Sequence, residues 1–188
     1  GEVDFIWPIT PEQYFEELEQ PAQKEWFDKS YVKASWNSPG LRYCGWNMLR
    51  PLFQDRRVRI ALSMLFDKKD FWEKKLHKAD TIVAESEYYF GLAYDHDIKP
   101  IGYSPKDAVE LLAEAGWVDS NGDGVLDKDG KKFEFTLIYP QGGPAYEPRS
   151  VIQQKQLKDV GIIMNVRMNE WASLIDKIKN KDFDAVYL

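Results

Sequence analysis

The sequence predicts an α/β fold, and three observations carry that prediction. Apolar residues alternate over 133–139 and again over 162–168, as in half-buried strands, and each segment is followed by a stretch with helical apolar spacing. A short apolar segment, 183–188, ends the chain as a further strand. Strands that alternate with helices pair in parallel through right-handed crossovers, so the second half predicts βαβ units in a mixed sheet flanked by helices.

The helices of the first half are predicted from their caps. Thr10 and Pro11, with Gln13 in the capping-box position, predict a helix that runs to about Glu19. Residues 20–40 show no clear period, and the aromatic segment 41–47 predicts a strand.

The strongest helical signal follows Asp55, which is the predicted cap of a helix with a continuous apolar stripe. Asp67 is the predicted cap of a second helix, which carries Phe71, Trp72 and Leu76. The residues of the stripe recur at i, i+3, i+4, i+7 and i+8: Val58, Ala61, Leu62, Leu65 and Phe66.

Three more helices are predicted in the second half. Ser104 and Pro105 open one that stops at Gly116, where a left-handed conformation ends helices readily. Its predicted buried stripe is Ala108, Leu111, Leu112 and Ala115. A second spans about 148–160, and the third begins at Trp171 and carries a stripe of Leu174, Ile175 and Ile178.

The acidic, glycine-rich segment 119–130 allows two interpretations. Asp119, Asn121, Asp123 and Asp127 stand at ligand positions of a calcium loop, but the twelfth position, which needs a bidentate glutamate, is Gly130. A strand rather than a helix follows. The alternative is a hairpin-like turn built on its Asn-Gly and Asp-Gly pairs. We favour the turn and keep a weak cation site open.

Composition excludes several partners. The net charge is −6 and no basic run is present, which argues against nucleic acid and anionic membranes. Aromatic residues reach 14%, and such amphipathic rings suit both cores and ligand contacts. Cys44 is the single cysteine and is expected to be a packing residue.

Catalytic motifs are absent. His77 and His96 are the only histidines, and neither has metal-ligand spacing, so a zinc site lacks ligands. No nucleophile elbow, P-loop or dinucleotide-binding glycine motif occurs. We therefore expect no enzyme and no cofactor, and the remaining hypothesis is binding.

Ligands of open α/β sheets bind at the carboxyl ends of the strands. The segments after the two alternating strands supply six candidate ligand contacts there: Tyr139, Gln141, Tyr146, Arg149, Glu170 and Trp171. For Trp171 a core position is the alternative, and for Arg149 a solvated helix start. Tyr146, placed on a loop, favours contact with a ligand.

The order of several segments resembles a known family. These are "GEVDFI" with "ITPEQYFEEL", "GWNMLRPLFQDRRVRIALSMLFDKKDF", "YSPKDAVELLAEAGW", "DSNGDGVLDKDGK", "FTLIYP" and "QLKDVGIIMNVRMNEWASLIDKIKNKDFDAVYL". They resemble the extracytoplasmic solute-binding proteins of family 5, the oligopeptide-, dipeptide- and nickel-binding proteins of ABC importers. The segment "GWNMLRPLF" leans towards the YejA-type branch.

The resemblance implies a lobe of the type II periplasmic-binding-protein fold and a piece of a longer, two-lobed protein. Residues 1–36 would be the tail of the first lobe, and 41–188 part of the second. Strand-like segments at both ends of the chain agree with a piece of a longer protein. The resemblance places Trp171 and Tyr43 at the ligand cavity and gives polar contacts to residues 141–149. The acidic residue that holds a peptide's ammonium group would lie beyond Leu188, and glycine stands where some dipeptide binders have an arginine for the ligand carboxylate.

The function that the resemblance implies is capture of oligopeptides or dipeptides between two lobes for delivery to a membrane permease. The expected partners are a peptide, the permease subunits and the first lobe of the same chain. The expected location is extracytoplasmic, in the periplasm or on a lipid anchor, with a signal peptide in the parent protein. The alternatives are another solute, such as nickel or an oligosaccharide, and a calcium-binding interaction module.

Overall fold

The computed structural model describes most of the chain: residues 6, 9, 11–34, 41–75, 84, 92, 94–95, 97–143 and 146–188. The chain divides into two compact units, which are described separately. One contains residues 1–40 and 68–84, and the other contains 41–67 and 85–188. Thr10, Leu76, His77 and His96, which figure in the sequence analysis, lie outside the described residues.

The smaller unit is helical. Its elements are α1 (Pro11–Phe15), the 3-10 turn η1 (Glu17–Glu19), α2 (Pro21–Ser30) and α4 (Lys68–Lys74). The predicted helix to Glu19 therefore ends early, and the irregular reading of residues 20–40 was wrong for α2. The sequence shows no period there because α2 is almost wholly exposed and has no apolar stripe. Proline at its first position and i,i+4 ion pairs such as Lys29–Glu25 support it instead.

Lys33 links the segment that follows α2 to α1 and η1 through polar contacts. Its ammonium group donates to the carbonyl of Tyr14 and to Glu19, and it lies 4.9 Å from the centre of the Tyr14 ring. Lys24 donates to the same carboxylate. These two cations lower the pKa of Glu19 to about 2.

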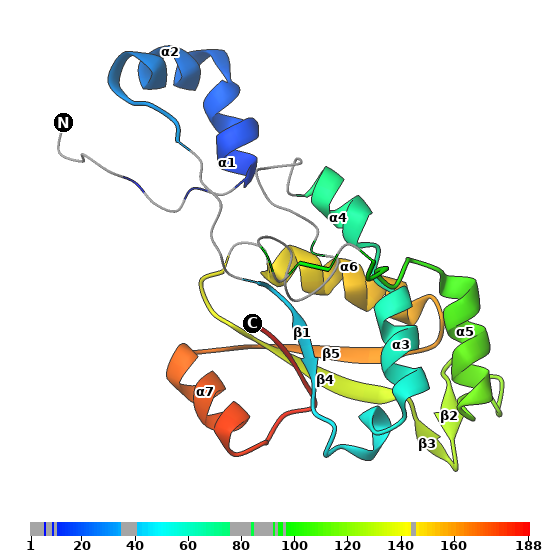
Figure 1. Ribbon diagram of the computed structural model, residues 1–188. Coiled ribbons are helices and arrows are strands. Elements are labelled where there is room, and N and C mark those ends of the chain that lie inside the picture. Colours follow the sequence, from blue (N-terminus) through cyan, green and yellow to red (C-terminus); the bar gives the residue numbers. More distant parts are fainter. Residues whose placement is uncertain are drawn as a thin grey trace. The chain divides into compact units, whose positions relative to one another are not determined.

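The larger unit is built on a four-stranded mixed sheet of order β1-β6-β4-β5 (Figure 1). The strands are β1 (Cys44–Trp46), β4 (Glu134–Pro140), β5 (Ile163–Asn169) and β6 (Ala185–Tyr187). β4 pairs in parallel with β5 and β6, which confirms the predicted crossovers, and β1 runs antiparallel to β6.

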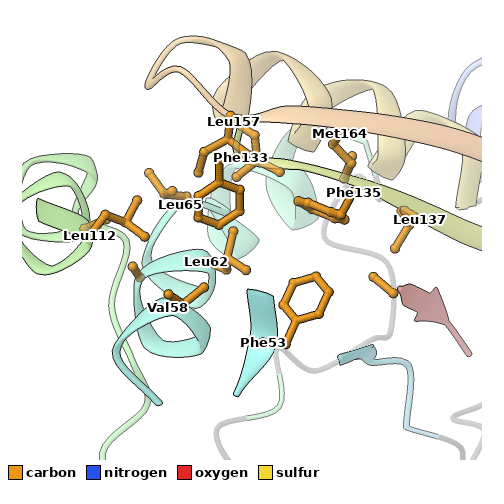
Figure 2. Close-up of a cluster of buried hydrophobic side chains, with 14 of the residues drawn as sticks. Phe53, Val58, Leu62, Leu65, Leu112, Phe133, Phe135, Leu137, Leu157 and Met164 are labelled. Atoms are coloured by element: carbon orange, nitrogen blue, oxygen red, sulfur yellow. The ribbon is translucent and has the colours of Figure 1, made fainter. Parts of the chain in front are cut away.

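Helices cover both faces of this sheet. α3 (Arg56–Met64), α5 (Pro105–Glu114) and α6 (Tyr146–Lys158) contribute to the main core on one face, whereas α7 (Trp171–Lys179) packs on the other. Helix α6 begins and ends two residues before the predicted 148–160. Figure 2 shows Phe133 between Leu62 and Leu65 on one side and Leu157 of α6 on the other, with Phe135 and Leu137 further along β4. In the described part of the chain, no helix is long and apolar enough to cross a membrane.

The predicted stripe of α3 forms the centre of this core. Val58, Ala61, Leu62 and Leu65 are at most 1% exposed, and Phe66 is buried at its end. In α5, Ala108 and Leu112 are fully buried, and Gly116 adopts the predicted left-handed conformation with φ +89°. The apolar period thus predicted the buried faces of both helices.

Asp55 caps α3 as predicted, accepting a hydrogen bond from the backbone N–H of Arg57 at 2.8 Å. Hydrogen bonds from the side chain and backbone of Arg57 lower the pKa of Asp55 from its ordinary 3.8 to about 2. A depressed carboxyl pKa stabilises the fold above the ordinary pKa, and this contribution is lost as the pH falls through about 2.

We therefore expect Asp55→Ala to lower the free energy of unfolding by about 1 kcal/mol at pH 7, the usual loss for a helix cap. The difference from wild type should shrink as the pH approaches 2. Denaturant unfolding at both pH values measures it. Glu110→Ala, an exposed carboxylate of α5, is the control and should change stability by less than about 0.5 kcal/mol. An equal loss of unfolding free energy at both pH values would contradict the role of Asp55 as a charged cap with a lowered pKa.

Segment 119–130 forms the turn that we favoured. β2 (Asp127–Lys128) and β3 (Lys131–Lys132) pair as a hairpin whose tip, Asp129-Gly130, has positive φ at both residues, as in a type I′ turn. The backbone N–H of Leu126 donates to the carbonyl of Gly161 at 2.8 Å. The loop is therefore docked on the turn between α6 and β5.

A polar cluster fixes the amino end of β6 to the turn after β1. The Asn47 amide donates to the carbonyls of Lys181 and Phe183. Asp184 pairs with Arg50 at 3.1 Å and accepts from the backbone N–H of Thr136 on β4 at 3.0 Å. These bonds hold β1 in register with β6, its antiparallel neighbour.

Candidate functional site

The candidate site is the sheet edge at which β4, β5 and β6 end. Because β1 runs the other way, its first residues lie at the same edge, and Tyr43 exchanges backbone hydrogen bonds with Leu188 there. The backbone N–H of Gln141 donates to the carbonyl of Asn169 at 2.8 Å, which joins the loops that follow β4 and β5. All of the predicted contact residues lie at or next to this edge.

On the α6 side, the edge carries three tyrosines. Tyr139 is 8% exposed and stacks on Tyr146 with ring centres 6.1 Å apart. Tyr146 stacks in turn on Tyr187, at 6.4 Å and an interplanar angle of 21°. Tyr146 is thus not an exposed loop residue, as expected from the sequence, but the half-buried first residue of α6. These stacked rings give the edge a rigid apolar wall.

On the α7 side, the edge carries aromatic rings that are open to solvent. Trp171, the first residue of α7, is 57% exposed, so the core alternative for it was wrong. Tyr43 is 47% exposed and shares a sheet face with Gly45, whose neighbour across the ladder is Val186. Glu170 caps α7 by accepting from the N–H groups of Ala172 and Ser173. Its carboxylate therefore positions the helix that presents Trp171.

Two arginines lie against the tyrosine wall. The guanidinium of Arg149, in the first turns of α6, lies 4.1 Å from the ring centre of Tyr187 and 5.2 Å from that of Phe66. The alternative of a solvated helix-start residue does not fit, because Arg149 is half-buried and its Nε is enclosed. Exposed Arg42 lies over the ring of Tyr146 at 6.0 Å. Both contacts are cation–π interactions.

The titratable groups beneath this wall are kept neutral. Burial raises the pKa of the Cys44 thiol to about 12, so this cysteine is a packing residue and not a nucleophile. Burial likewise raises the pKa of Tyr187, although the nearby Arg149 opposes the shift, and the phenol donates to Gln153 of α6. Burial and the charge of Glu147 raise the pKa of Tyr139. The tyrosines therefore act as neutral hydrogen-bonding and stacking groups.

In the acidic loop, the calcium-ligand candidates are occupied by the chain itself. Asp119 accepts from the N–H groups of residues 122, 123 and 124, and Asp127 accepts from Ser120. Asp123 pairs with Lys132 at 2.7 Å, and Asn121 accepts from the N–H of Asp123. Over the described residues, no group of three or more metal-ligating side chains that could hold an ion is found. These bonds account for the loop as a turn.

Two residues of the edge, Arg42 and Tyr187, were not among the contacts predicted from the sequence. Tyr187 was part of a predicted strand, and parallel pairing with β4 would have placed its end at the same edge. Arg42 precedes β1, whose antiparallel direction has no signal in the sequence, since pairing of a three-residue strand depends on distant residues.

The comparison with known proteins gives a family. The model of the bacterial extracellular solute-binding proteins, family 5 Middle, matches residues 1–188. The oligopeptide-binding protein AppA of Bacillus subtilis is 40% identical over 150 residues, 78% of this chain and 28% of AppA. YejA of Escherichia coli, described as uncharacterized, is 24% identical over 196 residues, 85% of this chain and 32% of YejA.

Solved structures agree with the fold. AppA in complex with a nonapeptide superposes with a TM-score of 0.73 at 40% identity, covering 78% of this chain and 30% of AppA. NikZ of Campylobacter jejuni in complex with Ni(L-His) gives 0.71 at 28% identity, covering 78% of this chain and 29% of NikZ. The chain therefore spans less than a third of these relatives, and its fold is that of a type II periplasmic binding protein. This protein belongs to the bacterial extracellular solute-binding proteins of family 5.

Proposed function

We propose that this chain is part of the solute-binding component of an ABC importer and that the solute is a peptide. The observation that carries the proposal is the 40% identity to an oligopeptide-binding protein whose structure holds a nonapeptide. The edge described above fits a peptide, because exposed aromatic rings and polar loops accept side chains of many kinds. Capture of this kind needs no covalent chemistry, and burial keeps Cys44, Tyr139 and Tyr187 of the described edge neutral.

In this proposal, residues 41–188 belong to the second of two lobes, and residues 1–36 to the end of the first. The peptide lies against the carboxyl edge of the sheet while the opposite lobe closes over it by a hinge motion. The protein works outside the cytoplasm and passes the peptide to permease subunits. Affinities in the micromolar range, about −8 kcal/mol, are typical of such reversible capture.

Titration calorimetry of the full-length protein with nine-residue peptides tests the proposal. Saturable heat with peptides of unrelated sequence supports it. Heat with Ni(L-His) and none with peptides would instead favour a nickel-chelate solute, the second candidate, which the similarity to NikZ supports. The 188 residues alone should give no saturable heat with peptides, because closure by an opposite lobe supplies much of the desolvated surface.

Trp171→Ala should weaken peptide binding about tenfold, because an aromatic ring at the centre of an interface contributes about 1–3 kcal/mol. The melting temperature should stay unchanged, since the ring is 57% exposed. Met48→Ala is the matched control: Met48 is 60% exposed, but it lies in the turn after β1, at the opposite edge of the sheet. Unchanged affinity for Trp171→Ala, or an equal loss for Met48→Ala, would remove Trp171 from the site.

A further inference from the structure

Gly143, in the loop after β4, is covered by the ring of Tyr146. A methyl group in place of its missing side chain would overlap two atoms of that ring, Cδ2 and Cε2. The φ angle of Gly143 lies outside the left-handed region, so the backbone itself would accept alanine. Glycine at this position is therefore explained by the space that the Tyr146 ring occupies.

The neighbouring glycine shows the opposite combination. Gly142 has φ +89°, where a side chain is strained. Among the described residues, its two chain neighbours aside, no atom lies within 4 Å of the position of its missing methyl group. The two glycines of this loop thus serve different purposes: Gly142 allows the turn, and Gly143 makes room for a ring.

The Tyr146 ring cannot move aside without leaving the tyrosine wall, which consists of Tyr139, Tyr146 and Tyr187. It stacks on the other two rings, with ring centres 6.1 and 6.4 Å away. Both neighbours are at most 8% exposed and belong to β4 and β6, so they cannot follow it. The backbone N–H of Tyr146 also donates to the carbonyl of Gly143 at 3.2 Å, which keeps the two residues together. A side chain at position 143 would therefore turn the ring out of the stack.

This placement affects the candidate site, because Tyr146 is half-buried and lies at the sheet edge that carries the predicted solute contacts. While it is stacked on its two neighbours, the ring presents a fixed surface. A fixed aromatic surface binds a solute with little loss of conformational freedom. A ring turned out of the stack would have to be ordered again whenever a solute binds, which costs side-chain entropy.

We propose that Gly143 is a positioning residue of the solute site: because it has no side chain, Tyr146 completes the tyrosine wall against which a peptide packs. The inference rests on the proposed function and assigns one more residue to it. Gly143 acts through the Tyr146 ring and need not touch the peptide.

A double-mutant cycle in the full-length protein tests this inference. Titration calorimetry measures the affinity for a nine-residue peptide of alanine, serine and glycine. Gly143→Ala should weaken binding about tenfold, the usual loss when an aromatic ring leaves an interface, and Tyr146→Ala should weaken it to a similar extent. Gly143→Ala should have no further effect in the Tyr146→Ala variant, because no ring is left to displace. Additive losses, or an unchanged affinity for Gly143→Ala alone, would overturn the inference.

Fluorine NMR of the protein labelled with fluorotyrosine measures the position of the ring separately. The signal of Tyr146 is identified by its absence from Tyr146→Phe. This signal should shift in Gly143→Ala. It should stay in place in Gly142→Ala, the matched control, which strains the loop without reaching the ring. An unshifted signal in Gly143→Ala would contradict the displacement of the ring.

Three further outcomes are distinct. If Gly143→Ala fails to fold, its combination with Tyr146→Ala should fold again, and a double variant that stays unfolded would refute the role of the ring. If wild type binds the peptide but the cycle is additive, only the inference fails and peptide capture stands. If wild type gives no saturable heat with the peptide, the proposed function is refuted, and the role of Gly143 in the solute site with it.

Discussion

Phe53→Ala should lower the free energy of unfolding by about 3–5 kcal/mol, the usual cost of removing a fully buried aromatic ring. The ring is 0% exposed and stacks on Trp46 with ring centres 5.2 Å apart. It meets Phe135 edge-on at 5.5 Å, and Figure 2 shows these two side chains. It joins β1, the 3-10 turn η2 (Pro51–Phe53) and β4 in one core. Truncation leaves a cavity that these rings cannot close, because Trp46 and Phe135 are themselves held by strands.

Leu49→Ala is the matched control for this prediction. Leu49 lies four residues earlier in the same segment but is 63% exposed, and its loss should change stability by less than about 0.5 kcal/mol. Denaturant unfolding with a constant m-value measures both variants. A loss below about 1 kcal/mol for Phe53→Ala, or equal losses for the pair, would contradict the core described above.

This pair also shows how far the sequence predicts the fold. Val58, Leu62 and Leu112 were assigned to the core correctly, because a long apolar period has only one side to bury. Met48, Leu49 and Phe53 lie in a segment without a period, and nothing local separates the exposed residues from the buried one. Which of these residues is buried depends on the orientation of the whole segment. Asn47 and Arg50 fix that orientation through their hydrogen bonds to residues 181–184, more than 130 positions away.

The sequence predicted the location of the candidate site correctly, but not the burial of its individual side chains. The rule that ligands bind at the carboxyl ends of parallel strands located the edge, because the direction of β4 and β5 follows from the crossover between them. Burial of the individual side chains did not follow. In the structure, Tyr139 and Tyr146 stack with Tyr187, and Trp171 is exposed. Both features depend on how α6 and α7 pack on the sheet, which the local sequence does not show. The cation–π contacts of Arg149 with Tyr187 and Phe66 likewise follow only from the packed structure.

Gly161→Ala should be strongly destabilising, by about 2–4 kcal/mol, for two reasons that act together. Gly161 has φ +83°, where an alanine costs about 1–2 kcal/mol. A methyl group there would also lie 2.9 Å from the carbonyl oxygen of Gly124 and 3.2 Å from the N–H nitrogen of Leu126, which donates to Gly161 itself. Backbone atoms cannot move aside by a rotamer change, as a side chain can. In Gly161→Ala, the docked loop 119–130 must therefore move away from the turn before β5.

Gly122→Ala separates the two causes. Gly122 lies in the same loop with φ +76°, but among the described residues, its two chain neighbours aside, no atom lies within 4 Å of the position of its missing methyl group. Its replacement should therefore cost only the conformational part, about 1 kcal/mol. Equal losses in the two variants would mean that the loop does not rest on Gly161 in solution. A larger loss for Gly161→Ala, with faster amide exchange at Leu126, is the result expected if the acidic loop serves as a structural brace and the calcium-like arrangement of its side chains is a by-product of its turns.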